Sequence, residues 1–140
     1  MSASGDKPLE AIAIVGLGLI GGSVAKDVRR LGLARKILGY DNNEDYHREI
    51  KSSNLTDYLS NVPDKNLAQA ELVLLAVPVK SFKKVLPAIL RNISSTAILT
   101  DTGSVKSPLL KMMYSPEYEN IRFVGGHPIA GSENFGPAAA

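Results

Sequence analysis

Cysteine is absent from this 140-residue sequence. Its absence excludes disulfide bonds, thiolate nucleophiles and cysteine-based metal sites together. We therefore expect no metal in the functional site, and we expect a reducing compartment, the cytoplasm, as the place where the protein works.

The sequence also has little net charge and no long apolar run. Its formal charge is +2 with scattered lysines and arginines, so it lacks the basic stripe of a nucleic-acid-binding protein. The longest apolar run, Leu72–Val79, contains Pro78 and is far shorter than the roughly 20 residues that cross a bilayer. The polar start, Met1–Pro8, lacks the apolar segment of a secretory signal. Neither a nucleic acid nor a membrane is expected as a partner.

The length and composition fit one globular domain. Apolar residues make up 44% of the chain and charged residues 21%, which is a folding rather than a disordered balance. The chain is too short for a cofactor domain followed by a separate substrate domain. We expect a disordered tail over residues 1–10 and one domain over residues 11–140.

Apolar runs that end at glycine, proline or polar turns predict strands, and amphipathic stretches between them predict helices. The helix over Ile20–Leu31 has apolar residues at spacings of four, four and three, and we expect it to end at Gly32. The weakly patterned residues 52–69 are expected to hold a brief turn and strand. Predicted strands cover 11–15, 36–40, 72–77, 97–100 and 121–124, and predicted helices cover 20–31, the polar stretch after 41–43 up to 50, 82–90 and about 108–113.

This alternation of strands and helices predicts the fold class. Because each strand is apolar throughout, we expect a parallel sheet with helices on both faces, connected by right-handed crossovers. The expected class is α/β, with a doubly wound, mostly parallel sheet of the Rossmann type. Ligands of such sheets bind beyond the carboxyl ends of the strands, so the residues that follow each strand are the candidate site.

A glycine-rich turn follows the first predicted strand and opens the first helix. The segment GLGLIG has glycine at Gly16, Gly18 and Gly21, the spacing of a dinucleotide-binding fingerprint. Gly16 would permit the tight turn, Gly18 would let the backbone approach a pyrophosphate, and Gly21 would allow close packing of helix on strand. The phosphates would lie on the free amides of the helix start, at Leu19 and Ile20. The alternative is that the glycines only shape the turn.

Asp41 ends the second predicted strand, about 20 residues after the fingerprint. A carboxylate at this position accepts hydrogen bonds from the adenosine ribose hydroxyls. It would repel a 2′-phosphate, and no arginine follows at once to neutralise it, so NAD is favoured over NADP. Alternatively, Asp41 only caps the next helix.

The two histidines are interpreted differently. His47 lies in a polar helical stretch and is predicted to be a solvated residue without a role. His127 follows the last strand in a glycine-rich stretch, where it is placed to accept the proton of a substrate hydroxyl as hydride leaves. The alternative is that His127 only bonds a loop. Ser104, after the preceding strand, either contacts substrate or caps a helix, and Lys106 either meets a carboxylate or is solvated.

Four segments together resemble the prephenate and arogenate dehydrogenase family of tyrosine biosynthesis. The resemblance runs from Ala11 to about Gly136, and its last segment is the most specific. The segments are GLGLIGGS at 16–23, LAVP at 75–78, DTGSVK at 101–106 and GHPIAGSE at 126–133. LAVP places Val77 and Pro78 among the expected cofactor-binding residues.

The resemblance implies an activity and assigns residues to it. The reaction is an NAD-dependent oxidative decarboxylation of prephenate to 4-hydroxyphenylpyruvate, or of arogenate to tyrosine. His127 matches the histidine that bonds the ring hydroxyl, and Ser104 matches the serine between that histidine and the nicotinamide. In this family a helical domain follows and supplies the homodimer interface and the basic residues for the substrate's carboxylates. Because this chain ends at Ala140, we expect that domain to be missing here and the chain alone to be inactive.

Two other functions stay open on the residues alone. The first is a free-standing NAD-binding module without catalysis, which the expected lack of a substrate domain favours. A β-hydroxyacid dehydrogenase-like enzyme also shares the glycine fingerprint and the Val77–Pro78 segment, although the segment around His127 argues against it.

Overall fold

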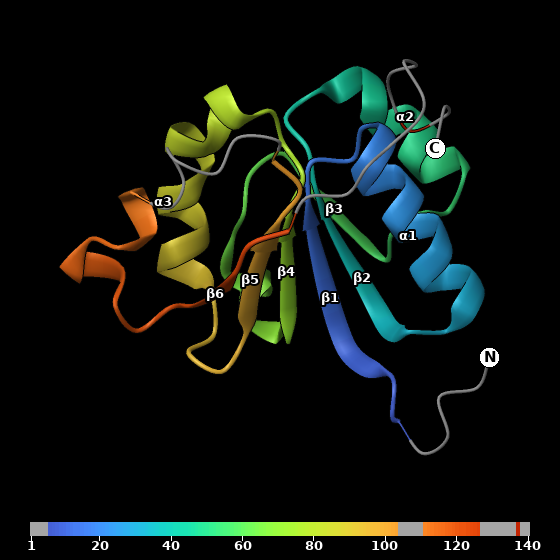
Figure 1. Cartoon of the computed structure of the whole chain (residues 1–140). Helices are drawn as coiled ribbons and strands as arrows, with labels where there is room; N and C mark the ends of the chain where they lie inside the picture. The colour runs from blue at the N-terminus through green and yellow to red at the C-terminus, as the bar shows by residue number, and fades with distance from the viewer. Residues whose placement is uncertain (1–5, 104–110, 127–136, 138–140) are drawn as a thin grey trace.

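Six parallel strands form one sheet in the order β3-β2-β1-β4-β5-β6 (Figure 1). The computed structural model describes residues 6–103, 111–126 and 137. Within them, the order reverses beside β1, with β2 on one side and β4 on the other, which is the topology of a doubly wound dinucleotide-binding sheet. The predicted fold class is confirmed. The strands are β1 (Leu9–Val15), β2 (Ala34–Tyr40), β3 (Tyr58–Ser60), β4 (Leu72–Leu75), β5 (Ile98–Asp101) and β6 (Arg122–Val124).

Helices cover both faces of the sheet. Figure 1 shows α1 (Leu19–Leu31) and α2 (Glu44–Ser52) on one face and α3 (Phe82–Asn92) on the other. Three single 3-10 turns lie in the connections, and residues 111–113 are also helical. The 3-10 turns are η1 (Lys65–Gln69), η2 (Val79–Ser81) and η3 (Pro116–Tyr118).

The central strand β1 explains why the core has two halves. Successive side chains of a strand point to opposite faces, so Ala11 and Ala13 pack in the cluster on the α3 face, whereas Ile12 and Ile14 pack in the cluster on the α1 face. All four are at most 3% exposed. A strand buried on both faces needs an apolar residue at every position, which is the pattern the sequence has.

Several predicted boundaries shift by one or two residues. The predicted tail over residues 1–10 is wrong at its end, because Leu9 and Glu10 belong to β1: the Leu9 amide donates to the Leu33 carbonyl at 2.9 Å, and the Glu10 amide donates to the Glu71 side chain. The predicted end of α1 is confirmed, since Gly32 has φ +63° and caps the helix. Of the helix predicted near 108–113, residues 108–110 lie outside the described residues.

Candidate functional site

Gly16 makes the tight turn between β1 and α1. Its φ is +97°, a conformation that side chains disfavour, and its amide donates to the Tyr40 carbonyl at 2.7 Å. A Cβ at this position would lie 2.6 Å from the Ala76 oxygen and 2.9 Å from Cγ1 of Val77. Gly16 is therefore required by its backbone angle and by its approach to the chain after β4.

The start of α1 is open above the turn. A Cβ at Gly21 would lie 1.8 Å from the Gly16 oxygen, so the helix packs on the turn without room for a side chain. At Gly18, in contrast, a Cβ would meet no atom of the described residues within 4 Å. Among the described residues no side chain caps the helix, and its first turn holds no acidic residue. The amides of Leu19 and Ile20 lie in the first turn, where an α-helix offers them no carbonyl acceptor. This helix start is therefore suited to bind an anion.

The Asp41 carboxylate connects the end of β2 to the same turn. Its Oδ2 accepts from the Leu17 amide and its Oδ1 from the Asn43 amide, both at 2.8 Å. The N-cap of α2 is Asn43, whose side chain accepts from the Asp45 amide. The alternative of Asp41 as the helix cap is therefore wrong. Each carboxylate oxygen accepts more than one hydrogen bond, so ligand hydroxyls can share these atoms.

His47 lies beside Asp41, which corrects its prediction as a solvated surface residue. Its side chain is half-buried, and its Nε2 hydrogen bonds the Asp41 carbonyl oxygen. Because a carbonyl only accepts, Nε2 carries the proton. The spacing carries a signal for this contact, since His47 lies in the first turns of the helix that begins just after Asp41.

Asp101 links the ends of β5 and β6 and was assigned no role from the sequence. It is 1% exposed, and its carboxylate accepts from the Gly103 amide at 2.9 Å and from the Gly126 amide at 3.1 Å. The nearby Thr102 amide donates to the Leu75 carbonyl, which fixes the same segment to β4. The DTGSVK motif contains this residue, but a motif alone does not show which strand supplies its partners.

The predicted cofactor residues meet at one edge of the sheet. The turn after β1 contacts both the carboxylate after β2 and the chain after β4, where Val77 is half-buried and Pro78 is exposed. The residues gathered here are Gly16, Gly18, Leu19, Ile20, Gly21, Asp41, Val77 and Pro78. The predicted catalytic residues Ser104 and His127, and also Lys106, lie outside the described residues.

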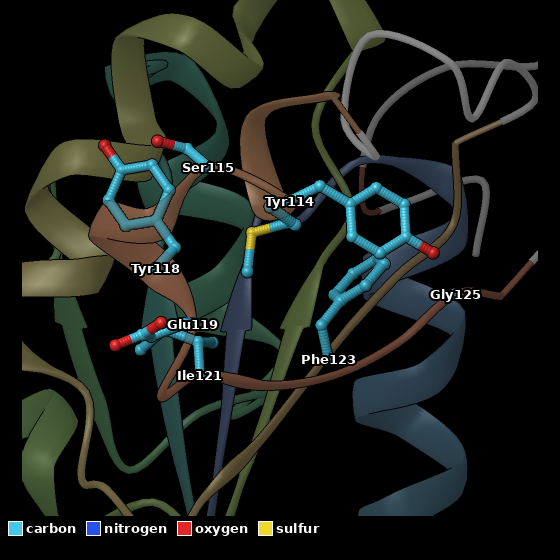
Figure 2. Close-up of a pocket in the computed structure, with 8 residues that line it drawn as sticks. Tyr114, Ser115, Tyr118, Glu119, Ile121, Phe123 and Gly125 are labelled. Carbon is cyan, nitrogen blue, oxygen red and sulfur yellow. The ribbon is translucent and has the colours of Figure 1, made fainter.

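A separate groove runs along β6 at the edge of the sheet. Figure 2 shows the side chains that line it, and its volume is about 520 Å³. The lining includes three aromatic rings, those of Tyr114, Tyr118 and Phe123, together with the carboxylate of Glu119. It contains no lysine or arginine, so this groove does not suit an anionic ligand.

The site has the features that a dinucleotide needs. The glycine turn leaves space at Gly18 where the backbone can approach phosphates, the helix start is without a cap or an acid, and Asp41 stands at the end of the neighbouring strand. Fold and site together define a nucleotide-binding domain of the Rossmann class.

Comparison with known proteins identifies the family. The family model "Prephenate dehydrogenase, nucleotide-binding domain" matches residues 24–140. The chain belongs to this family. It is 36% identical to the cyclohexadienyl dehydrogenase of Zymomonas mobilis over 91% of this chain and 43% of the relative.

Solved structures agree with this family. Prephenate dehydrogenase from A. aeolicus, solved in complex with hydroxyphenyl propionate and NAD+, is 36% identical with a TM-score of 0.80 over 94% of this chain and 46% of that one. Arogenate dehydrogenase from Synechocystis is 32% identical with a TM-score of 0.76, over 93% of this chain and 45% of that one. The chain thus spans less than half the length of each of these proteins. No helix in the described part of the chain is long and apolar enough to cross a bilayer.

Proposed function

We propose that this chain is the NAD-binding domain of a prephenate or arogenate dehydrogenase that catalyses oxidative decarboxylation in tyrosine biosynthesis. The observation that carries the proposal is the Asp41 carboxylate bonded to the Leu17 amide of an open glycine turn, in a chain whose family is that of prephenate dehydrogenases. We also propose that the protein works in the cytoplasm as a homodimer. A helical domain that follows this one would supply the basic side chains that bind the substrate's carboxylates.

In this proposal the described residues hold the cofactor. The amides of Leu19 and Ile20 bind the pyrophosphate, and Gly18 gives it access to the backbone. Asp41 accepts from the ribose hydroxyls and disfavours a 2′-phosphate, so the cofactor is NAD. Val77 and Pro78 form the wall beside the turn. When bound, NAD supplies an acceptor for hydride.

His127 and Ser104 would act on the substrate. Hydride leaves the ring carbon that bears the hydroxyl, and His127 accepts the hydroxyl proton. The bond from the ring to its carboxylate then breaks, carbon dioxide is released, and the electron pair of that bond makes the ring aromatic. The oxygen is left as a phenolate and takes the proton back from His127. Ser104 would bond His127 and keep its ring oriented.

Calorimetric titration with NAD and NADP tests the cofactor assignment. We expect the chain to bind NAD more tightly than NADP, and Asp41→Ala to weaken NAD binding by about 10- to 100-fold because charged hydrogen bonds are lost. The matched control is Asp57→Ala, since Asp57 also accepts a strand amide, that of Ile37 at 2.8 Å, but stands before β3 and away from the turn. Equal or tighter binding of NADP to the unaltered chain would overturn the assignment.

Turnover tests the reaction. In the protein that carries this chain, absorbance at 340 nm should rise with prephenate or arogenate and NAD, and His127→Asn should lower kcat by about 100-fold or more, as for loss of a general base. Oxidation of a 3-hydroxy acid in their place would favour the β-hydroxyacid alternative. NAD binding without oxidation of any of these substrates would favour a non-catalytic module.

A further inference from the structure

We propose that Asp101 is a positioning residue that fixes the two segments leading to Ser104 and His127 relative to each other. The proposal rests on the proposed function, in which those two residues act on the substrate. It assigns to Asp101 no contact with substrate or cofactor.

Burial sets Asp101 apart, since no other charged residue in the described part of the chain is buried. A buried carboxylate is costly unless hydrogen bonds compensate it. Its two oxygens accept from two amides on different segments, Oδ2 from Gly103 after β5 and Oδ1 from Gly126 after β6. One side chain therefore connects the ends of two neighbouring strands.

The glycines show how closely both segments approach Asp101. A Cβ at Gly103 would lie 2.9 Å from the Asp101 Oδ2, and a Cβ at Gly126 would lie 2.5 Å from the Asp101 backbone oxygen. Any side chain at Gly126 would have to displace main chain. Both segments thus leave the sheet in contact with the same residue.

The chemistry requires this residue type. A carboxylate offers acceptor atoms on both oxygens, whereas an asparagine would turn an NH2 donor toward one of the two amides. Ser104 is the next residue after Gly103, and His127 is the next residue after Gly126. When Asp101 holds the amides of the two glycines, it fixes the backbone directly before Ser104 and directly before His127. A misplacement of about 1 Å lowers a rate by as much as 100-fold, so such a link matters for turnover.

The test compares Asp101→Asn with the control Asp57→Asn. Asp57 also accepts a backbone amide but lies outside the site. In ¹⁵N NMR of the chain, hydrogen exchange at Gly103 or Gly126 should accelerate at least about 10-fold in Asp101→Asn and stay unchanged in the control, because a protecting bond is lost.

Three further measurements distinguish a positioning role of Asp101 from a purely structural one: the NMR signals of His127, kcat and the NAD dissociation constant. The chain has two histidines, so His47→Gln assigns their NMR signals. In Asp101→Asn we expect the ring signals of His127 to shift while those of His47 keep their positions. In the protein that carries this chain, kcat should fall by about 10- to 100-fold while the NAD dissociation constant changes less than about twofold.

A second variant keeps the proposal testable if Asp101→Asn does not fold. Gly126→Ala places a methyl group against the Asp101 backbone oxygen and so separates the β6 segment from Asp101, which should shift the ring signals of His127. Unchanged His127 ring signals and unchanged kcat, with exchange accelerated, would show a purely structural residue and overturn the proposal. If the unaltered protein oxidises neither prephenate nor arogenate, the proposed function fails, and the NMR readings still decide whether Asp101 positions His127.

Discussion

Two glycines of one turn have opposite surroundings. Gly16 has a positive φ and no room for a side chain, whereas Gly18 has a φ of −76° and open space beside it. Gly16 is needed for the fold, whereas Gly18 leaves the start of α1 accessible to a ligand. Residues of the same type in one motif therefore have separable consequences.

Alanine at each glycine should separate stability from binding. We expect Gly16→Ala to lower the free energy of unfolding by about 2–4 kcal/mol, from backbone strain and the clash with the Ala76 carbonyl. Gly18→Ala should change it by less than about 1 kcal/mol yet weaken NAD binding at least about 10-fold, because the methyl group occupies the approach of the phosphates. Urea unfolding and calorimetry measure the two effects. Equal loss of stability in both variants would contradict this distinction.

The sequence predicts which residues form the site better than it predicts their hydrogen-bond partners. The glycine spacing and the place of Asp41 follow from the strand that precedes each of them. The contact of His47 with the Asp41 carbonyl and the link from Asp101 to Gly126 were not predicted. Both join residues through backbone groups, and every residue carries those groups, so no pattern of side chains indicates which ones will meet.

At the scale of elements, α3 contains a proline in its interior. Pro87 is the sixth residue of the helix and is exposed, so the amide that would bond the Lys83 carbonyl is missing. The amphipathic pattern still predicts the helix, because Phe82, Leu86 and Ile89 are buried on one side. Packing of that face compensates for the missing bond.

Replacing this proline should stabilise the protein. Pro87→Ala restores the amide and removes the steric conflict with the preceding turn, partly offset by the greater freedom of the unfolded chain, for a net gain of about 1–2 kcal/mol. The measurement is the urea midpoint at constant m-value. Ala88→Gly, a half-buried neighbour in the same helix, is the control and should lower stability by about 1 kcal/mol. A lower midpoint for Pro87→Ala would show that the proline is favourable here.

Strand prediction depended on burial. The runs that form β1 and β4 are apolar because both of their faces pack in the core, and these strands were predicted within two residues. The edge strand β3 has three half-buried residues and no apolar run, so its place within 52–69 was not defined. β4 ends at Leu75 rather than at Val77, because apolar residues also line the turn that follows.

For the molecule as a whole, a half-buried hydrogen-bonded carboxylate, that of Asp64, shapes its response to pH. Asp64 accepts from the hydroxyls of Tyr40 and Tyr58, and so joins β2 and β3 to the segment before η1. Burial disfavours the Asp64 charge, but the hydrogen bonds from Tyr58, the Asn66 amide and Tyr40 outweigh it and lower the pKa of Asp64. Burial, and then the Asp64 charge, raise the pKa of Tyr40.

The lowered pKa of Asp64 predicts a loss of stability in acid. Its contribution is present above the unfolded pKa of about 4 and is lost as the pH falls through the lower folded value. At pH 7 we expect Asp64→Asn to cost about 1.5–3 kcal/mol, and this difference should shrink below about pH 4.

Urea midpoints from pH 7 to pH 2.5 measure the difference. The exposed Asp6 provides the control, and Asp6→Asn should have little effect at any of these pH values. A difference between Asp64→Asn and the unaltered chain that stays constant down to pH 2.5 would contradict the lowered pKa. At alkaline pH the raised pKa of Tyr40 has the opposite effect. The contribution of Tyr40 to stability is lost as the pH rises through its pKa in the folded state.

The strand order has a consequence for how the protein is made. Each strand lies beside one that precedes it in the chain: β2 and β4 beside β1, β3 beside β2, β5 beside β4, and β6 beside β5. Ribosomes deliver the N-terminus first, so β1 is available before any of its neighbours. No strand waits for a partner that has yet to be translated, and the sheet can grow outward from its centre during synthesis.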